Sequence, residues 1–322
     1  MTVPKLTRYM HATDVLIIGY AGALSVINLV FASRIPHWWL LILINIGATG
    51  LVCLLAYARH RTGWRLLRYL HDWYIFFGVL VAYKELYYMI NPIHGADYDD
   101  WLIAVDRWLF GVDPTVWIAQ WSHPALTEIL QIAYTAFYLL FFSIGYELYR
   151  RGDRDLFHLY VFTCVYGFFL SYLGYFTLPA IGPRFTLHDF ANLDRDLPGV
   201  LLTPYLRWFV NWAESIPMNV PNDVAIQLTQ RDVFPSGHTM MTLVLVYYAA
   251  HHRLRQRWFI YGIAVLLVVA TVYQRYHYVI DLVAGAVFMV ICVLSAPVLY
   301  RLVEDRLGTM EHAKAPPPVS PT

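Results

Sequence analysis

The chain has 322 residues, of which 59% are hydrophobic and only 14% are charged, and its mean hydropathy is +0.48. A soluble domain carries about a quarter charged residues, so this composition excludes an ordinary soluble domain and indicates a polytopic integral membrane protein. The formal net charge of +1 excludes the basic surface that nucleic-acid binding requires.

Apolar segments that can cross about 30 Å of hydrocarbon as helices predict an all-α bundle of about eight transmembrane helices. They cover residues 14–33, 38–58, 72–91, 126–149, 156–178, 236–251, 258–275 and 278–301. The sixth segment is short and begins inside the turn Pro235-Ser236-Gly237. No small-residue cleavage pattern follows the first segment, so we expect a retained membrane helix rather than a signal peptide.

The charge of the connections predicts the orientation of the spans, because cytoplasmic loops carry an excess of Lys and Arg. Every second connection is basic, with Lys5, Arg8, Arg59, Arg61, Arg65, Arg68, Arg150, Arg151, Arg154, Arg253, Arg255, Arg257, Arg301 and Arg306. We therefore expect both termini in the cytoplasm and residues 184, 238 and 275–281 on the outer side. In a bacterium the protein would lie in the cell inner membrane.

Two of the outer connections are long. In residues 92–125 the apolar residues recur at helical spacing with Trp on one side, which predicts a helix lying in the membrane interface. Asp97, Asp99 and Asp100 are interpreted as its solvated face. Residues 179–235 are too many for a structureless loop, so short helices are expected there, one of them at 201–212. The proline-rich residues 313–322 predict a disordered cytoplasmic tail.

Three ionisable side chains are predicted to meet at the outer ends of the last three spans. The apolar hairpin 240–273 returns the chain to the side it left, so His238 and His277 come together. Asp281 follows His277 by four residues, which places both on one helix face. Asp281 can accept a hydrogen bond from one ring nitrogen and make the other more nucleophilic. His238 can protonate a leaving oxygen, because imidazole titrates near neutral pH.

The surrounding residues suit a phosphate group. Ser236 and Gly237 open a helix, whose free backbone amides and positive dipole end attract anions. Arg184 and Arg275 could clamp the other phosphate oxygens through charge-assisted hydrogen bonds. For Arg275, an anchor in the lipid head-group layer is the alternative. Phosphoryl transfer requires mainly positioning and charge neutralisation, and these residues offer both.

Pro235-Ser236-Gly237-His238, followed by His277 and Asp281, resembles two signature motifs of the type 2 phosphatidic acid phosphatase superfamily. This resemblance implies a metal-independent mechanism without a cofactor. It also implies that His277 attacks phosphorus, that Asp281 supports it and that His238 protonates the leaving group. The stretch Leu109 to Thr115 and the element Gly182-Pro183-Arg184 resemble the inositol phosphorylceramide synthase-like branch.

The sequence also departs from the phosphatase pattern. The superfamily's first motif has a lysine seven residues before its arginine and a proline after it, where this chain has Thr177 and Phe185 around Arg184. The third motif usually has an arginine six residues before the nucleophilic histidine, where this chain has Thr271. Such departures are expected more of head-group transferases than of simple phosphatases.

The sequence thus predicts one membrane-embedded catalytic domain, residues 1–312, with a catalytic core over about 126–303. It would act on a lipid-linked phosphate or phosphodiester and pass the phosphoryl group to water or to a lipid acceptor alcohol. A transporter with Lys84 and Glu85 in its path, and a non-catalytic lipid-binding member, stay open. For the two histidines and Asp281, polar contacts between helices and a zinc site also stay open.

Overall fold

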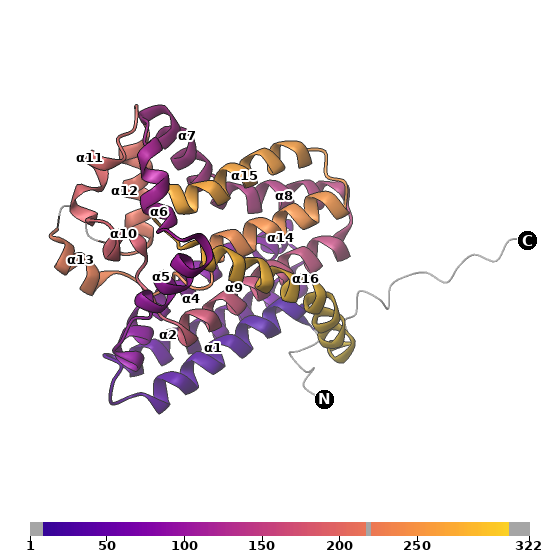
Figure 1. Ribbon diagram of the computed structural model, residues 1–322. Helices are drawn as coiled ribbons and strands as arrows, with labels where there is room; N and C mark the ends of the chain where they lie inside the picture. Colours follow the sequence, from indigo (N-terminus) through magenta and orange to yellow (C-terminus); the bar gives the residue numbers. More distant parts are fainter. Residues whose placement is uncertain (1–8, 217–219, 309–322) are drawn as a thin grey trace, which may run out of the picture.

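The computed structural model describes residues 9–216 and 220–308, which fold into helices without a strand (Figure 1). Its helices are α1 Ala12–Val30, α2 Trp38–Thr62, α3 Arg65–Trp73, α4 Ile75–His94, α5 Asp99–Phe110, α6 Pro114–Ile118, α7 Pro124–Thr135, α8 Phe137–Arg151, α9 Arg154–Thr177, α10 Pro183–Thr186, α11 Leu193–Asp196, α12 Thr203–Ala213, α13 Asn222–Leu228, α14 Gly237–His251, α15 Arg257–Tyr273 and α16 Val279–Leu307. Short 3-10 turns lie at Ala119–Trp121 and Phe190–Asn192.

The structure confirms the predicted all-helical bundle with apolar helices. Fewer of these helices than the eight predicted are long enough to be assigned as membrane spans. Among the described residues, four helices, α1, α2, α9 and α16, are long and apolar enough to cross a membrane. The pair α7 and α8 passes the same test as one span bent by 46°. Helices α14 and α15 have 15 and 17 residues, below the roughly 20 that cross the hydrocarbon upright.

Helix α9 lies at the centre of the bundle. Of its apolar window 61% is buried, against 17% to 28% for α1, α2 and α16. It packs against α1, α4, α8, α14 and α16, and its aromatic side chains fill much of the main core. Helices α1 and α16 therefore turn one face to α9 and expose apolar side chains on the opposite face, whereas α2 packs against α1 and α3.

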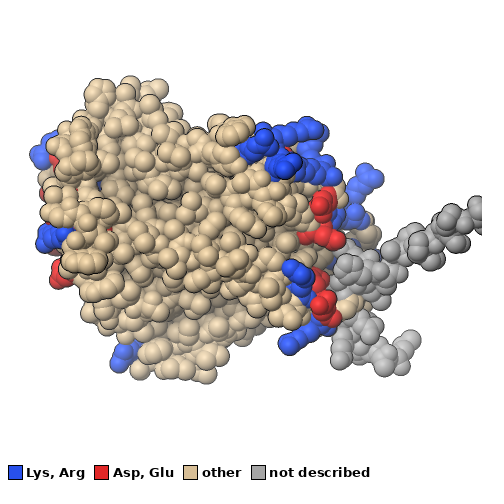
Figure 2. Space-filling model, turned by 45° about the vertical axis from the view of Figure 1, so that its right-hand side comes forward, with Lys and Arg blue, Asp and Glu red and all other residues tan. Residues whose placement is uncertain are grey.

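The two ends of the bundle differ in charge. The amide of Ala12 donates to Glu304 Oε1 at 2.7 Å, which joins the start of α1 to the end of α16. At the same end Arg151 donates to the carbonyl oxygen of His252 at 2.8 Å, so two of the predicted basic connections lie side by side. Figure 2 shows Lys and Arg gathered at this end. The short helices α10 to α13 occupy the other end (Figure 1).

The two long connections contain the helices expected of them. Helix α5 exposes 82% of Trp108, as an interfacial helix should, and α12 coincides with the helix expected at 201–212. The interpretation of Asp99 as a solvated residue is wrong, because this carboxylate is 4% exposed and binds backbone amides in the interior. The tail predicted at 313–322 lies outside the described residues.

Candidate functional site

The hairpin of α14 and α15 brings the two motif histidines together. His238 lies in the first turn of α14 and His277 lies just before α16, and their ring centroids are 6.1 Å apart. The starts of the two helices are joined directly, because the amide of Ser236 donates to the backbone carbonyl of Asp281 at 3.0 Å. A Cβ at Gly285 would lie 2.7 Å from the carbonyl oxygen of Ser236, so only glycine allows this approach.

The imidazole of His277 is oriented by the backbone. Its Nδ1 donates to the carbonyl oxygen of Val233 at 3.0 Å, and the nearest Asp281 oxygen is 3.5 Å away. The prediction of a direct hydrogen bond to Asp281 is therefore corrected: the carbonyl oxygen of Val233 holds the proton on Nδ1, and the Asp281 carboxyl lies beside it without a hydrogen bond. Burial lowers the pKa of His277 to about 4, against the opposing charges of Asp232 and Glu214. At neutral pH Nε2 thus carries a free lone pair.

Aromatic side chains pack against the ring of His238. Its ring stacks on Tyr134 with centroids 4.5 Å apart and lies 4.5 Å from the ring of Phe137. The hydroxyl of Tyr134 is 3.3 Å from Nδ1. The other nitrogen, Nε2, is sealed from solvent and has no hydrogen-bond partner in the described part of the chain. Because buried polar atoms are nearly always paired, this nitrogen is suited to a group that a substrate would bring.

Arg184 lies beside the histidines and is mostly buried. Its guanidinium lies over the ring of Tyr276, 5.0 Å from the centroid, and forms an ion pair with Glu214 through Nη2. Nε and Nη1 find no acceptor among the described residues. These two buried guanidinium nitrogens can therefore donate hydrogen bonds to an anion.

The loop before Arg184 is held in place by an acidic residue of α5. Asp99 accepts hydrogen bonds from the amides of Ile181 and Gly182 at 3.0 and 2.8 Å. Gly182 has a φ of 93°, and a Cβ there would lie 3.0 Å from the carbonyl oxygen of Tyr276. The turn therefore requires glycine, and it places Arg184 against the α15–α16 connection.

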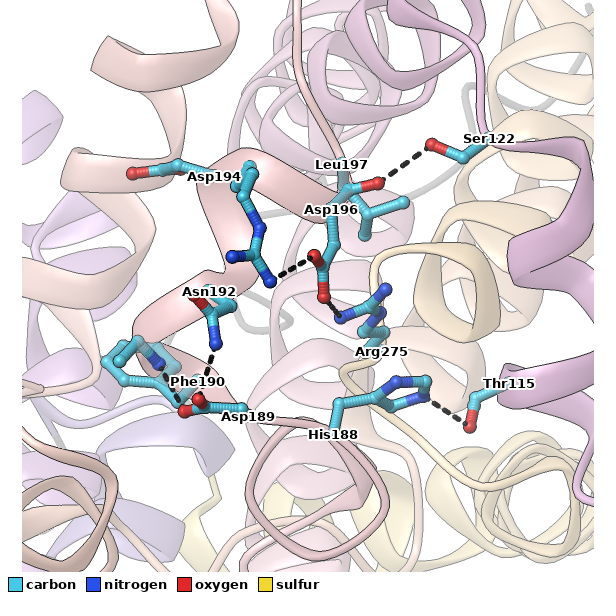
Figure 3. Close-up of polar contacts among 12 residues, drawn as sticks. Thr115, Ser122, His188, Asp189, Phe190, Asn192, Asp194, Asp196, Leu197 and Arg275 are labelled. Carbon is cyan, nitrogen blue, oxygen red and sulfur yellow. Dashed lines mark hydrogen bonds and ion pairs between the residues drawn. The ribbon is translucent and has the colours of Figure 1, made fainter.

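The side chain of Arg275 does not contact the histidines. Its Nη1 pairs with Asp196 at 3.2 Å, and Figure 3 shows this pair beside the bond from Ser122 to the carbonyl oxygen of Asp196. The backbone of Arg275 has a φ of 65°, an uncommon conformation for a residue with a side chain. Its carbonyl oxygen accepts the amide proton of Arg184 at 3.0 Å. Arg275 thus contacts the site through its main chain.

Ser236 and Gly237 lie where the sequence places them, at the start of α14. The Ser236 hydroxyl caps the helix by accepting from the amide of Thr239 at 3.2 Å. A Cβ at Gly237 would lie 2.5 Å from the hydroxyl oxygen of Tyr175, so the wall of the site is closed there. The amide of Ser236 donates to the carbonyl oxygen of Asp281 and that of Thr239 to the Ser236 hydroxyl, so the amides of Gly237 and His238 are left for a ligand.

A comparison with protein families identifies this arrangement. Residues 100–295 match the family model of the PAP2 superfamily. The chain belongs to the PAP2 superfamily. Comparison with curated proteins and comparison with solved structures each give no match. The matched residues include the whole hairpin, both histidines and Arg184, and also α5 from its second residue onward, whose part in the site the sequence did not reveal.

Two acidic residues near the histidines of this PAP2 chain were missed by the sequence analysis. Glu214 pairs with Arg184, and Asp232 accepts the hydroxyl proton of Tyr83. Burial and the charge of Glu214 raise the pKa of Asp232. Asp232 lies three residues before Pro235, and this nearness to the motif was a usable signal. For Glu214 the sequence contained no such signal.

A further carboxylate outside the motifs positions the PAP2 site. Asp106 of α5 accepts hydrogen bonds from the amides of Val279 and Ile280, both at 2.8 Å. It thereby caps α16 beside His277, and Asp281 completes the cap by accepting from the amide of Tyr278 at 2.8 Å. Burial raises the pKa of Asp106, while the two amides oppose this shift.

Within the described residues, one group of side chains has the spacing of metal ligands, and it lies elsewhere. The ligand atoms of His11, Asp72 and His158 lie within 4.8 Å of one another. Arg59 contacts His11, and Arg154 lies 3.6 Å from Asp72, so two cations already neighbour this group. It lies near the start of α1, at the opposite end of the bundle from His277, and takes no part in the histidine site.

Proposed function

We propose that this PAP2 protein is a membrane lipid phosphatase or head-group phosphotransferase that works through a phosphohistidine on His277. One observation carries the proposal. The two imidazoles lie 6.1 Å apart, and the free donors of Arg184 lie buried beside them. A phosphate between the rings would meet a nucleophile on one side, a proton donor on the other and a cation for its oxygens.

In the first step Nε2 of His277 attacks phosphorus, and the bond from phosphorus to the leaving oxygen breaks. Protonated His238 gives a proton to that oxygen, which removes the negative charge that develops on the departing alcohol or phosphate. The positive charge that develops on His277 lies near Asp281, whose Oδ2 is 3.5 Å from Nδ1. Arg184 and the amides at the start of α14 hold the equatorial oxygens.

In the second step His238 takes a proton from water or from an acceptor hydroxyl. The resulting nucleophile attacks the phosphohistidine, and Nε2 of His277 leaves. Water gives a phosphatase and a lipid alcohol gives a transferase. The departures around Arg184 and at Thr271 favour the inositol phosphorylceramide synthase-like branch. Arg275 can bind phosphate only if it leaves Asp196, so we assign it first to positioning Arg184.

The proposed topology has eight spans, with α4, α14 and α15 crossing alongside the longer helices and both termini in the cytoplasm. The gathering of Lys and Arg at one end of the bundle supports it (Figure 2). Under this topology the histidine site opens on the outer face, at the level of the lipid head groups. A substrate can then keep its chains in the bilayer while its phosphate reaches His277.

The test is to incubate purified protein with labelled phosphatidic acid, prenyl pyrophosphate or phosphatidylinositol, each with and without ceramide or diacylglycerol. Release of phosphate identifies a phosphatase, and a new phospholipid identifies a transferase. His277→Ala should abolish both products. It should also abolish the acid-labile label that a phosphohistidine would leave on the protein. Turnover that survives in this variant would refute the proposal. Flux of intact lipid through proteoliposomes that also survives would indicate a transporter.

A further inference from the structure

Glu85 is a buried carboxyl that the histidine site does not use. It is 6% exposed, and both of its hydrogen bonds use Oε1, which accepts from Asn28 at 2.8 Å and from Asn45 at 2.9 Å. Lys84 points elsewhere, to the hydroxyl oxygen of Ser215 at 2.5 Å, so the two residues do not pair. No donor in the described chain reaches the second oxygen of Glu85, Oε2.

Glu85 lines a cavity of about 590 Å³ between α1, α2, α3 and α4. The remaining walls are almost wholly apolar, and several of them, including Leu51, Phe77 and Val81, are more than half exposed on the lipid-facing surface. The cavity is therefore open sideways to the bilayer, and its size is that of a ligand pocket. An occupant must have an apolar body.

A second unpaired polar atom belongs to a residue that lines the same cavity. The hydroxyl of Tyr20, a lining residue, is sealed from solvent and has no hydrogen-bond partner among the described residues. It can donate a proton, whereas Oε2 of Glu85 can only accept one when ionised. Without water in the hydrocarbon, both atoms need a partner within the membrane.

We propose that this cavity binds an uncharged lipid alcohol, whose hydroxyl donates to Glu85 and accepts from Tyr20. A hydroxyl is both a donor and an acceptor, so it satisfies both atoms at once. An ammonium head could not accept from Tyr20. A phosphate head would lie against a carboxyl, and none of the lining residues carries a cationic group.

The depth of the site fits such a lipid. Asn45 follows the start of α2 by seven residues, and Glu85 precedes the end of α4 by nine. At 1.5 Å per residue these positions lie roughly 10 to 14 Å inside the ends of the helices, which are the ends nearer to the histidine site. The proposal concerns binding only and is independent of the chemistry proposed for His277.

The experiment uses the full chain in nanodiscs with a diazirine-bearing diacylglycerol as the probe, and the labelled peptides are mapped by mass spectrometry. We expect labelling of α1, α2 and α4 that unlabelled diacylglycerol competes away. The O-methyl ether of the same lipid, phosphatidic acid and a long-chain amine should each compete at least tenfold less well. Equal competition by any of the three would overturn the assignment of an alcohol.

Two variants test the place of binding. Gly78→Phe puts a ring into the cavity, and Gly262→Phe on α15 is its control, because an added Cβ meets nothing within 4 Å at either position. The first should abolish the specific labelling and the second should leave it unchanged. Tyr20→Phe removes one hydroxyl and should weaken competition about 2- to 10-fold. Undiminished labelling in Gly78→Phe, or unweakened competition in Tyr20→Phe, would refute the site.

Discussion

The carboxylate of Glu214 forms an ion pair with the guanidinium of Arg184, on the side of the site where the proposed phosphate would bind. Both side chains are buried, and Arg184 keeps two donors without acceptors in the described chain. Glu214 therefore neutralises the cation that substrate must reach, and the negative charge of a phosphate has to compete with it. This relationship makes anion affinity dependent on a residue outside the motifs.

Glu214→Gln should tighten the binding of vanadate, because Arg184 then lacks its counter-charge while the amide keeps one hydrogen bond. We expect the inhibition constant to fall about 3- to 10-fold, as a charge-assisted bond is worth about 1.5 kcal/mol or more. Inhibition curves measure it. Asp194→Asn is the matched control, since Asp194 pairs with Arg207 in the same way on a more exposed surface. An equal effect in both variants would contradict the role of Glu214.

His238→Ala should lower turnover of a natural lipid by about 10²- to 10⁴-fold, the usual contribution of a general acid. A substrate whose leaving group needs no proton, such as a nitrophenyl phosphate, should lose much less in the first step. Burst kinetics with the two substrates separate the steps. His188→Ala is a suitable control, because His188 contacts Thr115 and lies outside the histidine pair. Equal losses for both leaving groups would contradict acid catalysis by His238.

The pH dependence of the reaction should reflect the lowered pKa of His277. The nucleophile must be neutral, and burial brings the pKa of His277 to about 4, so protonation of His277 should not lower kcat/KM until the pH falls to about 5. His238 must be protonated to act as the general acid, so its deprotonation should set the limb on the alkaline side. Unfolded His277 binds its proton near pH 6.5, so the unfolded state takes up more protons and stability falls as pH decreases from about 6.5 to 4.

A pH–rate profile together with the unfolding temperature of wild type and His277→Ala checks both statements. The destabilisation of the wild type on acidification should be larger than that of the variant. A fall in kcat/KM as the pH decreases through 7 to 6 would show that His277 titrates normally and would contradict the lowered pKa.

Asp106→Asn should destabilise the start of α16. The carboxylate caps two amides beside His277, and loss of a capping interaction costs about 0.5 to 2 kcal/mol. We expect a lower unfolding temperature together with a lower kcat at nearly constant KM, because the nucleophile is displaced. Asp113→Asn removes the exposed pair with Arg107 and should leave stability nearly unchanged, because solvent screens an exposed ion pair. Comparable losses in both variants would argue against positioning by Asp106.

Chelators should leave the proposed activity unchanged, because the chemistry assigned to His277, His238 and Arg184 uses charge from the protein alone. The measurement is turnover before and after dialysis against EDTA, with vanadate inhibition as the positive control. A loss that added zinc restores would favour a metal mechanism at the histidines and would contradict the phosphohistidine proposal.

Sequence reasoning predicted the elements of the site because local signals determine them. Apolar length predicted the helices of the bundle, and the turn before His238 together with the return of the hairpin predicted that the two histidines meet. These features depend on residues close together in the chain, where spacing translates directly into geometry.

The partners of those residues were decided by tertiary structure alone. Asp99 was predicted to be solvated, but α5 packs against the starts of α10 and α16, where Asp99 and Asp106 accept hydrogen bonds from backbone amides. Glu214 reaches Arg184, and Asp196 takes Arg275, across long stretches of chain. The sequence by itself therefore determined an all-helical membrane chain with a histidine pair at one end. Only the folded structure decided which carboxylates neutralise and position that pair. Buried amides and charges need polar partners, and packing determines which distant residues lie close enough to serve.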